Sequence, residues 1–268
     1  MLHFLFIRNF LFAAIFFGAC NLSFGSATVN FVDRFDGKSF VHPGILLGAS
    51  QLHLLKQRIY DEPWRSALSK AKLSRYGAQD YLPKPWAQVD CGYISNPDNG
   101  CTDEKRDSAA AYTQALLWVA TGNEVYARNA ASIMNAWAVG LTGGHTNDNA
   151  VLQAAWVGEL WPRAGELLRY TYPIWSKSEQ NAFADMLRNQ YLPTIKNGAP
   201  CRSGNWEAST IDAMMNIAVF IDDRQFFEKS INLWRERVKS YFYIDSDGHT
   251  PRPPSSCPSK QKDLTKYW

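Results

Sequence analysis

The sequence predicts an all-α fold, an α/α toroid built as an incomplete barrel of helical hairpins. Apolar residues recur at helical spacing in long stretches from Asp107 onward, and no segment shows a convincing strand pattern. These stretches come in pairs joined by short turns, and residues 111–117 and 130–137 parallel residues 209–215 and 230–234. Related hairpins indicate a repeat architecture, for which we expect a double ring of helices rather than a four-helix bundle.

The first 27 residues have the pattern of a secretory signal peptide. His3 and Arg8 precede an apolar run from Phe10 to Ala19, and Gly25-Ser26-Ala27 offers small residues at the cleavage-determining positions. The run is too short to span a bilayer, and no other apolar segment is long enough to anchor the chain. We therefore expect a secreted protein, extracellular or periplasmic, without stable membrane insertion, whose residues 28–268 form one domain.

Composition favours a folded protein and argues against a nucleic-acid partner. Of 268 residues, 46% are hydrophobic, and the formal net charge of +3 comes from basic residues scattered along the chain. A mild positive charge suits an acidic ligand. The 10 Trp, 12 Tyr and 15 Phe residues are compatible with both sugar stacking and a large helical core. The oligomeric state is not readable from the sequence.

The cysteines predict disulfides. Cleavage after the signal leaves Cys91, Cys101, Cys201 and Cys257, and an even number in a secreted chain favours pairing. Of the three connectivities we favour Cys91 with Cys101 and Cys201 with Cys257. Their spacings do not suit zinc, so we expect no metal site.

The helices are expected in order along the chain. Ser50 is predicted to cap a first helix, Trp64 lies in a second, and Gly77 to Cys101 is predicted to be mostly loop. Ser176 or Ser178 is the expected cap of the second helix of the middle hairpin. The hairpin helices are expected at residues 107–120, 124–139, 148–170, 178–195, 205–221 and 224–241.

One end of this fold is the expected site. If the first helix of each hairpin forms an inner ring, the loops that precede these helices gather at one end, around one cavity. The loops contain residues 104–107, 145–149 and 202–207. The last begins a helix, whose N-terminus presents backbone N–H groups that bind anions. The candidate binding residues are Arg202, Trp206, Glu207, Arg106, Tyr112 and His145, and Asn205 lies in the last of these loops.

Simpler roles exist for the same residues. Asn205 and Asp107 are both residue types that cap helices, and Glu207 suits the first turn of a helix through the helix dipole. Trp206 is compatible with packing at the rim of the core. His145 follows Gly143-Gly144, where turn geometry explains it as well as ligand contact does.

Three features together resemble the alginate lyase superfamily, most closely polysaccharide lyase family thirty-eight and more remotely family five. The first is Gly204-Asn205-Trp206-Glu207-Ala208-Ser209, and the second is the hairpin from Ala111-Tyr112 to Ala136-Trp137. The third is Tyr241-Phe242-Tyr243 followed by Ser246-Asp247-Gly248. Each motif is weak alone, and their order and spacing from about His42 to Trp268 make the match fairly specific.

The resemblance implies an α/α toroid that cleaves β-1,4-linked polyuronates, such as alginate or glucuronan, by β-elimination without a cofactor. Asn205 matches the asparagine that neutralises the uronate carboxylate, a role that suits an amide donor. The resemblance also places an arginine, a tyrosine and a histidine on a helical segment after Tyr267-Trp268, so we expect the given chain to lack that segment.

Two other functions remain open at this stage. A glycoside hydrolase on the same toroid would use paired carboxylates such as Asp107, Glu159 or Glu207, although no pair stands out in the sequence. A non-catalytic protein that binds polyuronates would need the same cavity without the proton-transfer groups.

Overall fold

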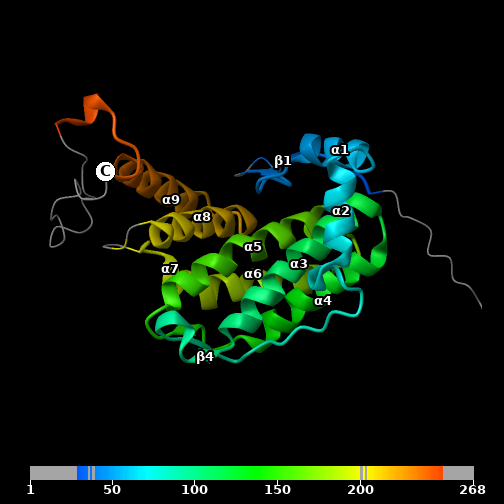
Figure 1. Cartoon of the computed structure of the whole chain (residues 1–268), viewed down its shortest axis with the longest axis horizontal. Helices are drawn as coiled ribbons and strands as arrows, with labels where there is room; N and C mark the ends of the chain where they lie inside the picture. Colours follow the sequence, from blue (N-terminus) through cyan, green and yellow to red (C-terminus); the bar gives the residue numbers. More distant parts are fainter. Residues whose placement is uncertain (1–28, 36, 38–39, 200–201, 203, 250–268) are drawn as a thin grey trace, which may run out of the picture.

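The computed structural model describes residues 29–35, 37, 40–199, 202 and 204–249, and this part is mainly helical (Figure 1). The helices are α1 (Ala49–Arg58), α2 (Trp64–Leu73), α3 (Cys101–Thr121), α4 (Glu124–Gly140), α5 (Ala150–Thr171), α6 (Lys177–Met186), α7 (Leu192–Ile195), α8 (Asn205–Phe220) and α9 (Arg224–Arg237). The strands are β1 (Arg34–Phe35), β2 (Val41–His42), β3 (Val89–Cys91), β4 (Asp98–Asn99) and β5 (His145–Thr146). The all-α prediction is confirmed, because each of these strands has only two or three residues.

The long helices form two layers. Helix α5 packs between α3 and α8, so the first helices of the three hairpins lie side by side in one layer. Helix α4 contacts α3, α5 and α6 on the other side, and α9 packs on α8 (Figure 1). This arrangement agrees with the expected inner helices, and closure into a toroid stays a prediction.

Helix α3 begins at Cys101, whereas the sequence pattern placed its start at Asp107. Gly100 takes φ +87°, which glycine adopts without strain, and Asp98 accepts a hydrogen bond from the Thr102 N–H at 2.9 Å. Asp107 therefore lies inside the helix and is not its cap. Its buried carboxylate accepts hydrogen bonds from the Trp137 indole and the Tyr81 hydroxyl, both at 2.7 Å.

The segment expected as one helix over residues 178–195 is interrupted. Ser176 caps α6 and accepts a hydrogen bond from the Glu179 N–H, as one of the two predicted caps. Residues Leu187–Tyr191 then form a π-helical turn before α7. Pro193 lies just after this turn, and a proline lacks the N–H donor that an uninterrupted α-helix needs. Similarly, α1 begins at Ala49 after Gly48, so Ser50 is not its cap.

A small sheet and a disulfide organise one end of the layers. Strand β3 pairs antiparallel with β4 and parallel with β5. The predicted Cys91–Cys101 disulfide is confirmed and joins β3 to the first residue of α3. The predicted signal peptide and the Cys201–Cys257 pair lie outside the described residues.

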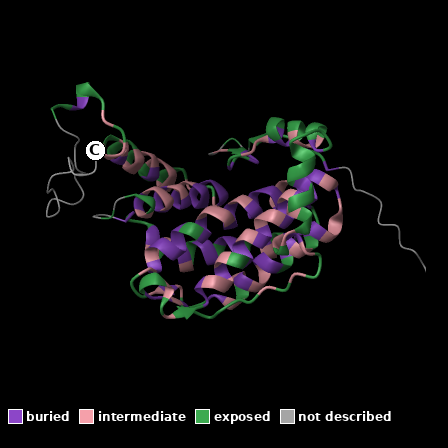
Figure 2. Ribbon diagram, in the orientation of Figure 1, coloured by how far each residue is buried: buried purple, intermediate pink, exposed green. Residues whose placement is uncertain are grey.

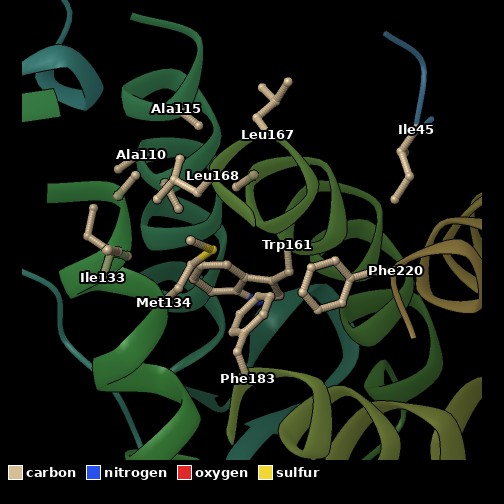
Figure 3. Packing of buried hydrophobic residues seen from close by; sticks show 14 of the residues in the cluster. Ile45, Ala110, Ala115, Ile133, Met134, Trp161, Leu167, Leu168, Phe183 and Phe220 are labelled. Atoms are coloured by element: carbon tan, nitrogen blue, oxygen red, sulfur yellow. The ribbon is translucent and has the colours of Figure 1, made fainter. Parts of the chain in front are cut away.

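The core fills the space between the two layers (Figure 2). Trp161 of α5 lies at its centre, with its ring edge-on to Phe183, which in turn contacts Phe220 (Figure 3). The aromatic-rich helices thus use their large side chains mostly for packing, and Trp137, Trp161 and Trp175 are all fully buried. Gly158 and Gly165 of α5 lack side chains at the contacts with α8 and α6 and let the helices approach closely.

Replacing Gly165 by alanine should destabilise the protein. A Cβ there would meet the rings of Phe220 and Phe183 at 2.8 and 2.9 Å, and overpacking of this kind costs about 1–3 kcal/mol. The matched variant is Gly158→Ala, whose Cβ would meet Ala213 at 3.1 Å and should be tolerated better. Urea unfolding measures both. Equal stability of the two variants would contradict this packing argument.

His42 attaches the N-terminal hairpin β1–β2 to the helical layers. Its Nδ1 lies 2.5 Å from Glu166 Oε1 of α5, and its Nε2 lies 3.0 Å from Asp222 Oδ1 in the turn before α9. The imidazole also stacks on the Tyr170 ring at 4.9 Å. Burial works to lower the pKa of His42, but the two carboxylates outweigh it, and the net effect raises the pKa.

The raised pKa of His42 predicts that the stability of the protein depends on pH. Because the folded-state pKa of His42 is raised, its contribution is complete below its unfolded pKa of about 6.5 and is lost as pH rises through the folded value. The free energy of unfolding of the wild type should therefore fall over this range by more than that of His42→Gln. Urea unfolding between weakly acidic and alkaline pH tests this, and parallel pH profiles for the two proteins would refute it.

Candidate active site

A cavity of about 490 Å³ opens where the small sheet meets the start of α8. It is lined by Tyr93, Ile94, Asp148, Asn149, Leu152, Arg202 and Trp206. The Arg202 guanidinium stacks over the Trp206 ring at 4.4 Å from its centre, so that a cation and an indole face form one wall. Two of the three loops expected around one cavity therefore contribute to it, through Asp148 and Asn149 and through Arg202 and Trp206, whereas residues 104–107 lie within α3 and do not line it.

The opposite wall is held by the sheet. The Asn149 N–H donates to the Cys91 carbonyl at 2.9 Å, and the Asn149 side chain donates to the Gly92 carbonyl at 2.6 Å. Thr146 also donates to Asp90 at 2.8 Å. The disulfide-closed loop that carries Tyr93 is thus fixed to the turn before α5, and this loop was not predicted to line the site.

Asn205 is the first residue of α8 and is exposed, next to Trp206 in the chain. Gly204 occupies the N-cap position with φ +65°, so Asn205 does not serve as the cap. Among the described residues, no group hydrogen-bonds the Asn205 amide. Asn205 is not among the residues that line the cavity, but its amide lies at a helix N-terminus, where backbone N–H groups and the helix dipole favour an anion.

Glu207 points away from the cavity. It is 1% exposed, and its Oε2 accepts a hydrogen bond from the Ala199 N–H at 2.5 Å. Burial raises the pKa of Glu207, against the opposing effects of the Ala199 hydrogen bond and of Arg237. The expected substrate contact is therefore not found at Glu207, which instead ties the start of α8 to the preceding segment.

His145 is also enclosed. Its side chain is 0% exposed, with Nε2 lying 2.9 Å from Glu104 Oε1 and its ring against Tyr191. Glu104 further accepts hydrogen bonds from the Tyr191 hydroxyl and, at 2.7 Å, from Gln153. This buried network supports the cavity from behind, so His145 does not reach a ligand in this structure.

Arg106 and Tyr112 lie on different faces of α3. Arg106 is exposed near the Tyr81 phenol and is not among the residues that line the cavity. Tyr112 is half-buried on the face towards α5, close to Arg163. Burial raises the pKa of Tyr112, and the nearby guanidinium opposes that rise.

Arg163 belongs to a polar cluster on α5 and α8 that sequence reasoning did not assemble. It forms an ion pair with Asp212 at 2.5 Å, while Asn216 donates to Asp212 at 3.3 Å. Glu159 lies beside them with its carboxyl hydrogen-bonded to Ser209, and burial together with Asp212 raises the pKa of Glu159. These side chains lie in two rows, or stripes, one along α5 and one along α8.

The stripes connect this cluster to the cavity. On α5, Leu152 at the cavity is followed by Trp156, Glu159 and Arg163 at helical spacing. On α8, Asn205 is followed in the same way by Ser209 and Asp212. The signal was present in the sequence, since Asp212 and Glu207 are the only charged residues of α8, but only the packing shows that the stripes face each other.

A family model, described as alginate lyase, matches residues 58–253. The chain belongs to the alginate lyase family. The match spans the three hairpins, the cavity and the polar cluster, so this chain carries a polysaccharide lyase domain and its substrate class is a polysaccharide. No curated protein and no solved structure matches the chain.

The described residues of this alginate lyase family member contain neither a metal-binding cluster nor a membrane-spanning helix. No group of three or more His, Cys, Asp or Glu side chains comes together there in a way that would hold a metal ion. None of the helices in the same part of the chain is long and apolar enough to cross a membrane.

Proposed function

We propose that this protein is a secreted lyase that cleaves β-1,4-linked polyuronates, alginate or glucuronan, by β-elimination. The observation that carries the proposal is the exposed Asn205 amide at the start of α8, which no described residue hydrogen-bonds and which directly precedes Trp206 of the wall formed with Arg202. Together these residues offer a hydrogen-bond donor, a positive charge and an apolar ring face. A uronate unit has a carboxylate and an apolar sugar face that match them.

Elimination makes definite demands on such a site. The uronate carboxylate must be neutralised so that the C5 proton becomes acidic, a base must remove that proton, and an acid must protonate the departing O4. The proposal assigns the first task to Asn205, whose NH2 donates hydrogen bonds to the developing negative charge without supplying a proton. Arg202 and Trp206 bind the polysaccharide, while Glu207 and His145 hold the walls of the cavity in place.

Tyr112 supports a substrate path along the inner helices. A phenol of ordinary pKa, about 10, is protonated at neutral pH, and burial raises the pKa of Tyr112 further, so its hydroxyl can donate a hydrogen bond there. Tyr112 lies close to Arg163, which belongs to the polar cluster further along α5 from the cavity. The proposal therefore extends substrate contact from the cavity to Tyr112 and does not include Arg106.

Glycoside hydrolysis is the second candidate, because Glu159 and Asp212 interact within this cluster. A half-buried carboxyl with a raised pKa beside a second acidic side chain, here Asp212 paired with Arg163, is the arrangement of a general acid with its partner. Incubation with alginate and glucuronan separates the candidates. Lyase action gives reducing ends together with the ultraviolet absorbance of a C4–C5 unsaturated product, hydrolysis gives reducing ends alone, and a binding protein gives neither.

Asn205→Ala should lower the elimination rate by about 100-fold or more, the usual loss when one donor to a developing anion is removed. The free energy of unfolding should change by less than about 0.5 kcal/mol, since the amide has no hydrogen-bond partner within the described part of the chain. Rates come from product absorbance and stability from urea unfolding.

Two variants sharpen that test. Asn205→Asp keeps the side-chain shape but replaces the donor with a negative charge, so it should be at least as inactive as the alanine variant. Asn197→Ala removes another exposed amide from the segment before α8 and should leave the rate unchanged. An active Asn205→Ala enzyme would rule out the neutraliser role.

A further inference from the structure

The segment that leads into α8 is held by three side chains that do not line the cavity. Glu207 accepts from the Ala199 N–H at 2.5 Å, and Arg237 donates to the Arg202 carbonyl at 3.0 Å. Tyr241 donates to the Gly204 carbonyl at 2.7 Å. These hydrogen bonds fix the backbone at Ala199, at Gly204 and at Arg202, whose side chain forms part of the cavity wall.

Arg237 is an unusual choice for such a contact. It lies at the end of α9 and is 2% exposed, although burying a guanidinium costs free energy unless the charge is compensated. Its Nη2 makes the hydrogen bond to Arg202, while its Nε and Nη1 are buried and have no hydrogen-bond partner in the described part of the chain. A methionine or leucine would fill the same space at lower cost.

The Arg237 guanidinium lies over the Tyr241 ring, 5.8 Å from its centre. It also works against the effect of burial, which raises the pKa of Glu207, and the Glu207 Oε1 is likewise buried and without a hydrogen-bond partner in the described part of the chain. These two buried side chains each make one hydrogen bond to the backbone of the same short segment, Glu207 at Ala199 and Arg237 at Arg202. Together, these two hydrogen bonds fix the backbone that carries the Arg202 side chain.

The geometry points to Arg237 as a positioning residue for polysaccharide binding, which acts by holding the Arg202 backbone so that the Arg202 guanidinium stays stacked on Trp206. This inference rests on the proposed function of the cavity and adds a residue of α9 to it. It gives α9 a part at the site, although none of the α9 side chains lines the cavity.

The consequence is an effect on substrate binding that depends on Arg202. Arg237→Met should raise KM for the polyuronate about tenfold, the size expected when a charged hydrogen bond is lost, with a smaller change in kcat. Arg237→Lys keeps the charge and a donor and should recover part of the affinity. Arg235→Met makes the same replacement at an exposed position of α9 and should leave KM unchanged.

A double-mutant cycle separates positioning from general stability. If Arg237 acts through Arg202, then Arg202→Ala should raise KM in the wild type but add little in the Arg237→Met background. If Arg237 only stabilises the fold, the two effects should multiply, and that result would overturn the inference. Should Arg237→Met fail to fold, Glu207→Gln with Arg237→Met removes both buried charges and replaces it in the cycle.

Hydrogen exchange of the unliganded protein tests the same inference without any substrate. Arg237→Met should speed exchange at the Ala199 and Arg202 amides relative to Arg235→Met, and unchanged exchange would contradict positioning. A wild type that neither binds nor cleaves polyuronates would refute the proposed function, while the exchange result would still decide whether Arg237 fixes this segment.

Discussion

The cavity end of the molecule depends on one buried carboxylate, Glu104. Its oxygens accept hydrogen bonds from Tyr191 and Gln153 and face the His145 ring, so a single group joins α3, α5, β5 and the π-helical turn. Tyr191 in turn accepts from the Trp161 indole at 2.8 Å at the centre of the core. A buried polar group costs free energy when its hydrogen bonds are not made, so the pairing of Glu104 favours the joint packing of these elements.

This network gives the binding surface a rigid support. The loop closed by Cys91 and Cys101, the turn before α5 and the beginning of α3 are all fixed to it or to each other. The surface itself consists of side chains from other parts of these segments, including Tyr93 and Asn149. Preorganised walls reduce the entropy that is lost when a flexible polysaccharide binds.

The other wall is built differently. The segment before α8 has no strand or disulfide among its described residues, and it relies on Glu207, Arg237 and Tyr241 instead. Hydrogen bonds from side chains hold the backbone of this wall, whereas strand pairing holds the backbone of the opposite wall. The proposed lyase site thus lies between a wall fixed by backbone pairing and a wall fixed by buried charges.

The sequence by itself determined the helical class, the pairing of helices into hairpins and the first disulfide. These follow from local periodicity and from cysteines close in the chain, which need no knowledge of distant contacts. It also singled out Arg202, Asn205 and Trp206, because an unusual mixture of polar and aromatic residues precedes an apolar helix. The early start of α3 was missed because Gly100 and Asp98 act through turn geometry.

Only the tertiary structure decided which polar residues face the cavity. Glu207 and His145 look like ligand contacts in the sequence, yet packing turns both into the interior, where Glu207 accepts a hydrogen bond from Ala199 and His145 pairs with Glu104. Conversely, Arg163 and Asp212 lie 49 residues apart and meet only because α5 packs against α8. The direction of a side chain depends on which helix face is buried, and that is fixed by neighbours distant in sequence.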